Sequence, residues 1–520
     1  MMMMMMEHRY ICILVLVLVM NLLASHGGCN GLHSFGYDMH HLFSDPVKGI
    51  LGAHDFPHKG TTKYYAVMEQ RDRLFRGRRL AADQHHTPLT FAAGNETYQI
   101  DSFGFLHFAN VSVGTPALWF LVALDTGSDL FWLPCNCTSC VHGLKTSSGK
   151  VLELNIYDMK RSSTSQNVLC NSSLCDESSQ CTSSGSTCPY QVKYLTNGTS
   201  TTGILVEDVL HLVTDDDQTK DVDTPITLGC GQVQTGAFLD GAAPNGLFGL
   251  GMSNISVPSI LANQGLISNS FSMCFGPDGL GRITFGDNTS LVQGQTPFNL
   301  RHLHPTYNIT ITQIILGGIA ADLEFNAIFD SGTSFTYLND PAYTQITKNF
   351  NSMIKQERYS SSSGSDTDLP FDFCYNISPN QTIEVPTVNL TMKGGDNYFV
   401  INPIVTVTGL DVGELLCLGV LKSENVNIIG QNFMTGYRII FDRDNMVLGW
   451  KESNCYDDEL SNLNINQSHS PAISPAIAVN PEATSNGSYN GPGKLLPSHS
   501  FNLRPNFAFV LALFFILAIS

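Results

Sequence analysis

Basic residues are scarce in this chain of 520 residues. Lysine and arginine together number 27, against 45 aspartates and glutamates, and the formal net charge is −18 at pH 7. Binding to nucleic acid needs a clustered basic face that neutralises phosphates, so this balance argues against a nucleic-acid partner. An acidic surface with few lysines is typical of a protein that must stay folded in acid, because fewer positive charges then accumulate and repel one another.

Hydrophobic runs long enough to cross a membrane comfortably are also missing. The N-terminal run from Ile11 to Met20 follows Arg9, which indicates a cleaved secretory signal peptide over residues 1–26 rather than a membrane span. Acceptor triplets for N-glycosylation fit a secreted glycoprotein; they include Asn95, Asn110, Asn171, Asn197, Asn254, Asn288, Asn308, Asn376 and Asn389.

At the other end of the chain, thirteen apolar residues lead to Ile519, too few to span a bilayer comfortably. A polar spacer and small residues around Asn486 precede them, so we expect residues 498–520 to be the signal for a glycolipid anchor. A retained hydrophobic tail is the alternative. The Ser-, Asn- and Pro-rich residues 457–497 predict a stalk. We therefore expect a protein of the secretory pathway, held by its anchor at the extracellular face of the plasma membrane or in the cell wall.

No pair of histidines accompanies the cysteine cluster that has metal-ligand spacing, Cys135, Cys137 and Cys140. A zinc site there is the weaker interpretation, and we expect no metal and no cofactor. Of the 14 cysteines, Cys12 lies in the predicted signal peptide and Cys29 just beyond it. The remaining even number in a secreted chain predicts six disulfides; these cysteines are Cys135, Cys137, Cys140, Cys170, Cys175, Cys181, Cys188, Cys230, Cys274, Cys374, Cys417 and Cys455.

Residues 27–95 differ in composition from the rest of the chain. They hold seven histidines and eight lysines or arginines against six acids, a net charge of +2 in a chain of −18. A basic arm ahead of an acidic body predicts a propeptide that docks electrostatically as a removable inhibitor, and that acid releases by protonating the body's carboxylates. A flexible leader is the alternative. The spacing of Tyr65, Met68 and Leu74 predicts helical order over residues 62–80.

Two segments place an aspartate at the tip of an apolar strand. In FLVALDTGSDLFW, Asp125 follows the run from Phe120 to Leu124, and in FNAIFDSGTSFTYL, Asp330 has the same setting. Each aspartate opens a turn with a hydroxyl residue, a glycine and a second hydroxyl residue. An unpaired carboxylate at the end of a buried strand would be costly, so two such tips predict a carboxylate dyad.

An internal duplication extends beyond these turns. A strand precedes each aspartate, and a pair of apolar residues and a glycine follows much later, as LFG at 247–249 and IIG at 428–430. The repeat predicts an N-terminal lobe over residues 96–290 and a C-terminal lobe over 291–456. Within the first lobe, the insertion 134–188 is rich in cysteine and small polar residues, so disulfides must hold it in place of a core.

Three further elements are predicted from local pattern. The stretch from Gln191 to Leu210 predicts a hairpin around an Asn-Gly tip, with Tyr194 near its start. Pro258 and Pro341 each suit the beginning of a helix, the second helix reaching Phe350.

These motifs resemble the pepsin-like aspartic proteases over roughly residues 103–455. Either Asp-Thr/Ser-Gly triplet alone is a weak signal, whereas two triplets with their apolar-apolar-Gly partners are specific. The cysteine-rich insertion is similar to that of the plant nepenthesin-like group. The leader FGYDMHHLFSDPVKGIL and the anchor signal resemble the aspartyl protease family protein 1 branch of that group.

The resemblance implies an all-β-dominated, bilobal fold, with two pseudo-symmetric β lobes, a peptide-binding cleft between them and few short helices. It also implies a monomeric aspartic endopeptidase, made as a zymogen with its own propeptide as a partner. Its substrates would be proteins or peptides with bulky apolar residues at the scissile bond. Two rival functions are a catalytically silent relative that acts as an inhibitor or carbohydrate-binding protein, and a glycosidase, whose carboxylates would stand farther apart.

The chemistry itself requires two carboxylates. Hydrolysis of a peptide bond by water needs a base that takes a proton from the water and an acid that protonates the departing nitrogen. Two carboxylates a hydrogen bond apart cannot both ionise easily, so Asp125 and Asp330 are expected to share one proton and to supply both roles in acid. This sharing is the general property of aspartic proteases and is carried over to this chain.

The resemblance assigns supporting roles around the dyad. The first hydroxyl of each turn buttresses it, the glycine lets the backbone approach the carboxylate, and the second hydroxyl donates to the outer carboxylate oxygen. These residues are Thr126, Gly127, Ser128, Ser331, Gly332 and Thr333. Tyr194 corresponds to the flap tyrosine and Trp132 to its indole partner, with aromatic packing as the alternative. We expect other acids, Asp208 and Asp442 among them, to be solvated.

The resemblance also implies a pairing for the cysteines. The implied bridges are Cys374–Cys417, Cys274–Cys455, Cys140–Cys230, Cys170–Cys188 and Cys175–Cys181, which leaves Cys135 with Cys137.

Overall fold

The computed structural model describes residues 34–42, 44, 47, 57–77, 90–93, 96–99 and most of 105–456. Within the last range, the gaps are 146–150, 176–180, 195–197, 215–219, 278, 290–292, 300–305, 360–368, 378–382, 410–412 and 425. The chain divides into two compact units, residues 1–461 and 462–520, and every described residue belongs to the first. The predicted signal peptide, stalk and anchor signal lie outside the described residues. Among the helices that are described, none combines the length and the apolar character needed to cross a membrane.

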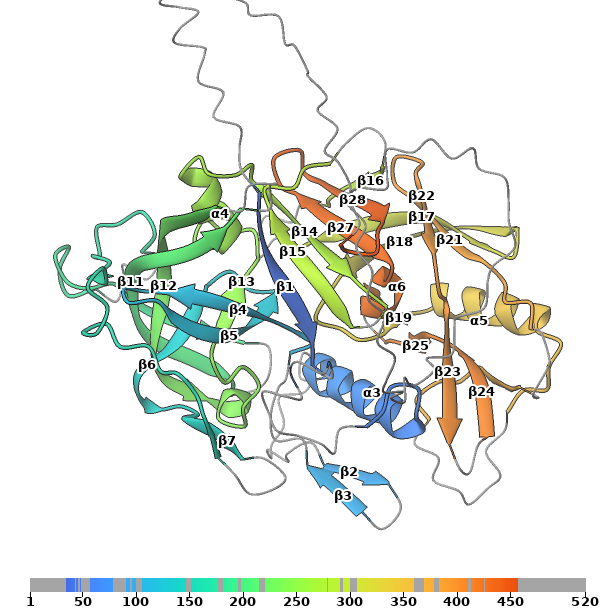
Figure 1. Cartoon of the computed structure of the whole chain (residues 1–520). Helices are drawn as coiled ribbons and strands as arrows, with labels where there is room; N and C mark the ends of the chain where they lie inside the picture. The colour runs from blue at the N-terminus through green and yellow to red at the C-terminus, as the bar shows by residue number, and fades with distance from the viewer. Residues whose placement is uncertain are drawn as a thin grey trace, which may run out of the picture. The chain divides into compact units, whose positions relative to one another are not determined.

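The fold is mostly β, as predicted, and its largest sheet has 14 strands (Figure 1). Its order is β10 (Pro189–Lys193), β11 (Ser200–Val213), β12 (Asp221–Thr235), β6 (Trp132–Ser139), β13 (Leu247–Gly249), β5 (Leu118–Asp125), β4 (His107–Val113), β1 (Phe35–His41), β15 (Leu280–Phe285), β14 (Ser270–Phe275), β27 (Tyr437–Asp442), β28 (Val447–Glu452) and β16 (Gly294–Pro297), with β9 (Gln166–Asn167) paired to β11. Strands from both halves of the chain therefore share one hydrogen-bonded sheet.

A second sheet of seven strands comes from the second half of the chain. Its order is β22 (Asn397–Val400), β21 (Val388–Met392), β17 (Asn308–Leu316), β18 (Ile319–Phe329), β26 (Ile428–Ile429), β19 (Thr336–Leu338) and β25 (Val420–Lys422). Small sheets are formed by β20 (Cys374–Asn376), β24 (Gly413–Leu418) and β23 (Ile404–Gly409), by β2 (Thr90–Ala93) and β3 (Glu96–Gln99), and by β7 (Gly143–Lys145) and β8 (Val151–Glu153).

The helices are few and short, and three of them match predictions. Helix α3 (Thr62–Gly77) lies where the leader predicted helical order. Helix α4 (Val257–Asn263) carries Pro258 in its first turn, and α5 (Ala342–Met353) follows Pro341. The predicted hairpin is confirmed as the antiparallel pair β10 and β11. A single turn, α6 (Gln431–Met434), and the 3-10 turn η2 (Gly236–Phe238) complete the set of described helices.

The duplicated motif is confirmed by matching strand pairs. Strand β13 runs parallel to β5 and sets Gly249 opposite Asp125. Strand β26 runs parallel to β18 in the same way, with Ile429 opposite Phe329. Strand β5 is buried over most of its length, because strands pack on both of its edges and side chains cover both faces; this is why it reads as a continuous apolar run rather than an alternating one.

The leader, as we call residues 27–95, contributes strand β1 and helix α3, which pack against the rest of the chain, called the body. Strand β1 pairs with β15 from Phe35 to His40 and with β4 at His40 and His41, so it fills the place between the two (Figure 1). Phe35 and Met39 are fully buried there. Helix α3 packs on the second half of the chain, where Tyr65 contacts the ring of Phe371 edge-on, with 5.6 Å between ring centroids.

Six disulfides form, as predicted, but four of the implied pairings are wrong. Cys374–Cys417 and Cys274–Cys455 are confirmed. The implied bridges Cys140–Cys230, Cys170–Cys188, Cys175–Cys181 and Cys135–Cys137 are replaced by Cys135–Cys230, Cys137–Cys140, Cys170–Cys181 and Cys175–Cys188. The reason is register: β6 runs parallel to β12, with Leu133 opposite Cys230, and this brings buried Cys135 close to Cys230, while Cys140 lies farther along.

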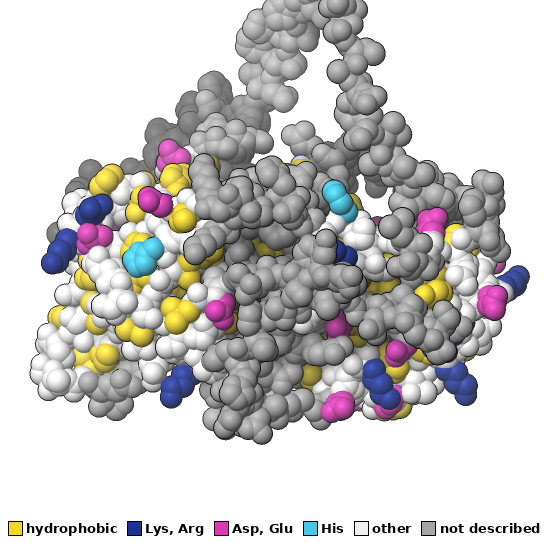
Figure 2. All heavy atoms as spheres, turned by 90° about the horizontal axis from the view of Figure 1, so that it is seen from below, with side chains coloured by type: hydrophobic (Ala, Val, Ile, Leu, Met, Phe, Trp, Pro, Cys, Tyr) yellow, Lys and Arg dark blue, Asp and Glu magenta, His cyan; other side chains and the backbone are white. Residues whose placement is uncertain are grey.

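Figure 2 shows one face of the molecule in space-filling form. Basic and acidic side chains are interspersed among uncharged ones on the described part of that face.

Gly249 offers a test of the parallel strand pair, because a Cβ built on it would lie 2.1 Å from the carbonyl oxygen of Asp129. We expect Gly249→Ala to force β13 away from the turn that follows Asp125, called the first turn below. This should lower the free energy of unfolding by about 3 kcal/mol or more. Gly185→Ala is the matched control, since a Cβ there meets no atom within 4 Å. Thermal unfolding of the two purified variants measures the difference; equal stability of both would contradict the tight approach.

Candidate active site

The turn after β5 holds the carboxylate of Asp125 with its own donors. The N–H of Gly127 donates to Oδ1 at 2.9 Å, and the hydroxyl of Ser128 donates to Oδ2 at 2.6 Å. A Cβ on Gly127 would lie 3.2 Å from that Oδ1, so glycine gives the turn the room that the approach requires. Thr126 is buried.

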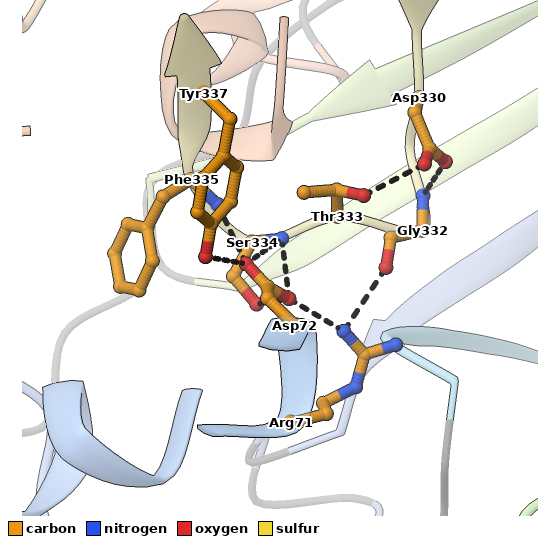
Figure 3. Close-up of polar contacts among 8 residues, drawn as sticks. All are labelled: Arg71, Asp72, Asp330, Gly332, Thr333, Ser334, Phe335 and Tyr337. Atoms are coloured by element: carbon orange, nitrogen blue, oxygen red, sulfur yellow. Dashed lines mark hydrogen bonds and ion pairs between the residues drawn. The ribbon is translucent and has the colours of Figure 1, made fainter. Parts of the chain in front are cut away.

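The turn after β18 repeats this arrangement around Asp330. The N–H of Gly332 donates to Oδ1 at 2.8 Å and the hydroxyl of Thr333 to Oδ2 at 2.7 Å (Figure 3). Ser331 is buried. The hydrogen bonds that the motif assigns to the second hydroxyl of each turn are therefore present in both halves.

Electrostatic coupling links the two carboxylates. Burial raises the pKa of Asp125, and the negative charges of Asp330 and Asp129 raise it further, against the lowering effect of the donors Ser128 and Gly127. Both aspartates keep part of their surface accessible. A raised pKa favours retention of one proton by the pair in weakly acidic solution, which is the state that general acid and base catalysis by two carboxylates needs.

Asp129 has a structural role that its sequence position did not reveal. Its Oδ1 accepts the N–H of Ser253 at 2.9 Å. A Cβ on Gly251 would lie 2.3 Å from the same oxygen. The carboxylate therefore ties the first turn to the loop that follows β13, and its charge contributes to the raised pKa of Asp125.

The hairpin of β10 and β11 brings Tyr194 to the first turn. The indole N–H of Trp132 donates to the hydroxyl of Tyr194 at 2.8 Å, as expected for a flap tyrosine and its partner. Phe238 contacts both rings edge-on, with centroids 4.9 Å from each. Burial and the negative charge of Asp125 raise the pKa of Tyr194 well above its usual range, so its hydroxyl stays protonated. The sequence did not single out Phe238, which lies in the single 3-10 turn η2 and belongs to no motif.

The leader reaches the second turn through two buried residues of α3. Arg71 pairs with Asp72 at 2.9 Å and donates to the backbone carbonyl of Gly332 at 3.0 Å (Figure 3). Burial lowers the pKa of Arg71, while the charges of Asp72 and Asp330 raise it. Asp72 in turn accepts hydrogen bonds from residues just beyond the turn. The net basic charge of the leader predicted docking, but it did not identify these two residues.

Two histidines meet where β1 pairs with β4. His41 of the leader lies opposite His107, and their rings are 5.5 Å apart in an edge-on contact. Both are buried. Burial lowers the pKa of His107 to about 3, and the charge of Arg71 adds to this, against a hydrogen bond to the backbone of Ser331. Burial, His107, Lys59 and Arg71 together lower the pKa of His41 well below its usual range.

The expectation that Asp208 and Asp442 are solvated is wrong, because both are buried. Asp208 accepts hydrogen bonds from Thr164 at 2.6 Å and from Tyr157. Burial acts to raise the pKa of Asp442, but donors on Asn445 and Thr289 outweigh it and lower the pKa. The donors that satisfy each carboxylate belong to none of the sequence motifs described above.

Comparison with known proteins connects this geometry to a family. Two family models match, described as xylanase inhibitor N-terminal over residues 107–287 and xylanase inhibitor C-terminal over residues 306–452. Aspartyl protease family protein 1 of Arabidopsis thaliana is 57% identical over 459 residues, which cover 88% of each chain. Aspartic proteinase nepenthesin-1 of Nepenthes gracilis is 28% identical over 384 residues, 67% of this chain and 78% of that protein.

Among solved structures, basic 7S globulin from soybean is similar with a TM-score of 0.51 and 21% identity, over 67% of this chain and 91% of that chain. This likeness shows the fold alone.

The buried pair of Arg71 and Asp72 tests how α3 is held. We expect Asp72→Ala to leave the charge of Arg71 in the interior without its carboxylate, which costs about 3–5 kcal/mol, and so to loosen the helix from the second turn. Limited proteolysis within residues 57–77 measures this. Asp38→Ala is the control: it breaks another leader pair with arginine, to Arg282, in which the aspartate side chain is 58% exposed, worth about 1 kcal/mol or less. Equal protection in the two variants would contradict the docking contact.

Proposed function

Because this chain belongs to the pepsin-like aspartic protease family, in its plant nepenthesin-like group, we propose that it is an acid-active endopeptidase whose dyad is Asp125 and Asp330. The observation that carries the proposal is the pair of matching turns. In each, an intact carboxylate is held by a glycine N–H and a hydroxyl, and the two charges act on one another.

The proposed mechanism uses one proton shared by the dyad. The ionised member takes a proton from a water molecule, and the oxygen of that water attacks the peptide carbonyl carbon. The protonated member donates its proton to the carbonyl oxygen. The tetrahedral intermediate then collapses: the carbon–nitrogen bond breaks, the nitrogen receives a proton from the dyad, and one hydroxyl of the intermediate returns its proton to the dyad, which again holds one proton. At higher pH both carboxylates ionise and the acid is lost, so activity falls as pH rises through the raised pKa of Asp125.

Tyr194 and Trp132 fit the role of a flap over the bound peptide. Their mutual hydrogen bond and the packing of Phe238 hold the tyrosine ring beside the first turn. A closing flap excludes water from the reacting groups, which strengthens the electrostatic interactions there.

We further propose that the intact chain is a zymogen. Helix α3 sets Arg71 against the backbone of Gly332, two residues after Asp330, and β1 occupies a place between strands of the body. A peptide substrate would compete with α3 for the surface beside the second turn, so cleavage requires that the leader first be displaced.

Replacement of either carboxylate by its amide tests the dyad. Asp125→Asn and Asp330→Asn each remove the ability to share the proton, and we expect kcat to fall by at least about 10³-fold. The measurement is cleavage of an unfolded polypeptide by acid-processed protein. Asp240→Asn is the matched control, because Asp240 is exposed. Cleavage that survives either dyad replacement would reject Asp125 and Asp330 as the catalytic pair, whereas no cleavage by the unaltered protein would favour the silent, binding relative.

Acid release of the leader depends on His41 and His107 under this proposal. Both stay neutral when docked, because their pKa values are lowered, whereas a solvent-exposed histidine takes up a proton below about pH 6.5. Their contribution to docking is therefore complete above that pH and is lost as pH falls toward about 3, where His107 also protonates in the docked state. We expect His41→Gln to move the release of the leader to lower pH and to reduce its dependence on pH by about one proton.

Hydrogen exchange of residues 57–77 against pH, corrected for intrinsic rates and measured in an Asp125→Asn background that prevents self-cleavage, reports this release. His58→Gln is the control, because His58 is exposed. An unchanged profile for His41→Gln would assign the acid response to carboxylates of the body alone.

A further inference from the structure

The carboxylate of Asp72 lies in a ready-made binding site for an anion. The N–H of Ser334 donates to both of its oxygens, at 3.0 and 2.9 Å. The hydroxyl of Ser334 donates at 2.8 Å, the N–H of Phe335 at 3.2 Å and the hydroxyl of Tyr337 at 3.1 Å (Figure 3). All four donor groups come from residues 334–337, which we call the carboxylate cradle.

The cradle belongs to the second catalytic turn. Ser334 directly follows Thr333, whose hydroxyl binds Asp330. A group bound in the cradle therefore lies one residue along the chain from a donor to the catalytic carboxylate. A peptide lying across the dyad would pass this surface.

The body holds the cradle in shape independently of α3. The carbonyl of Thr333 accepts the N–H of Gln431 at 2.8 Å, and that of Ser334 accepts the N–H of Asn432 at 3.1 Å. Tyr337 is fixed in β19 between Leu421 and Ile428. Removal of the leader would thus leave the donors aimed at the same point.

The ligand chemistry follows from the donor set. Both backbone N–H groups can only donate hydrogen bonds, and both hydroxyls can donate as well. A carboxylate has two acceptor oxygens and matches all four donors, whereas an amide would place its NH₂ group, itself a donor, against some of them. Arg71, the cation paired with Asp72, comes from the same helix and would leave with it. A carboxylate is therefore the ligand that best matches the cradle, because its two oxygens can accept from all four donors, as those of Asp72 do.

We propose that, once the leader is displaced, the cradle is a substrate subsite for the acidic side chain of an aspartate or glutamate, and that Asp72 occupies this subsite in the intact chain. The inference rests on the proposed function. It adds a preference for one acidic residue to the bulky apolar residues expected at the scissile bond.

The test uses acid-processed protein and a set of fluorogenic peptides with one apolar scissile pair. Each flanking position in turn carries Asp or Asn, and an all-Asn parent reports cleavage itself. At pH 5, where an aspartate side chain is ionised, we expect Asp to exceed Asn in kcat/KM by about tenfold at one position, mainly through KM. The ratio should decline toward one as pH falls below about 3.5, because the substrate carboxylate then protonates.

Two variants locate the effect. Tyr337→Phe removes one donor of the cradle and should reduce the Asp-to-Asn ratio severalfold. Tyr343→Phe is the matched control, since the hydroxyl of Tyr343 binds Asp372 at 2.5 Å, and it should keep the ratio of the unaltered protein. Loss of the ratio in both variants, or in neither, would overturn the assignment to the cradle.

The outcomes separate this inference from the function on which it rests. If the parent peptide is cleaved but no position favours Asp, the protease stands and the acidic subsite is overturned; the cradle then binds backbone. If no peptide is cleaved, the proposed function fails. In that case binding of a synthetic peptide of residues 62–77 decides the cradle: Asp72 binding about tenfold tighter than Asn at that position supports it, and equal affinity overturns it.

Discussion

Asp125 lies at the end of β5, which is buried over most of its length, and Asp330 directly follows β18, in which Ala327 and Phe329 are buried. The donors of each turn make these carboxylate positions tolerable. An ionised carboxylate removed from water without partners costs several kcal/mol. The glycine N–H and the hydroxyl of each turn supply two hydrogen bonds, one to each oxygen. Because these donors are local, each half of the chain can hold its carboxylate before the two halves act together.

Each of the two turns is packed closely against the backbone of a glycine from a later segment. Gly249 lies against the carbonyl of Asp129, and Gly430 lies equally close to that of Phe335, with 2.1 Å between a built Cβ and the oxygen in each case. A side chain at either position would push the parallel partner strand off its aspartate. The apolar-apolar-Gly motif is therefore the steric counterpart of the turn that it supports.

The leader makes use of the same turn that holds Asp330. Backbone and hydroxyl donors beyond Thr333 bind Asp72, and the carbonyl of Gly332 binds Arg71. Residues 332–337 thus carry two sets of polar groups. One set binds Asp330, and the other binds Arg71 and Asp72 of α3. The leader also places buried His41 against buried His107, with 5.5 Å between their ring centroids.

Most of what the sequence predicted concerns features whose physical cause is local. The aspartate turns, the strands before them, the hairpin with Tyr194 and helix α3 each follow from residues within one segment, and their duplication made the family recognisable. Pairing of distant segments was less accessible. The bridge Cys135–Cys230 depends on the register of β6 against β12, which residue spacing does not encode.

The same limit applies to buried charge. Asp208 and Asp442 look like ordinary surface acids in the sequence, and only the fold surrounds them with donors. The amino-acid sequence by itself determined the two carboxylate turns and the duplicated β architecture that presents them, because strand pattern and turn chemistry act over a few residues. Tertiary structure alone decided that Cys135 joins Cys230, that Asp208 and Asp442 are buried and that Asp72 fills the cradle beside Asp330, because those outcomes depend on how separate segments of the chain pack together.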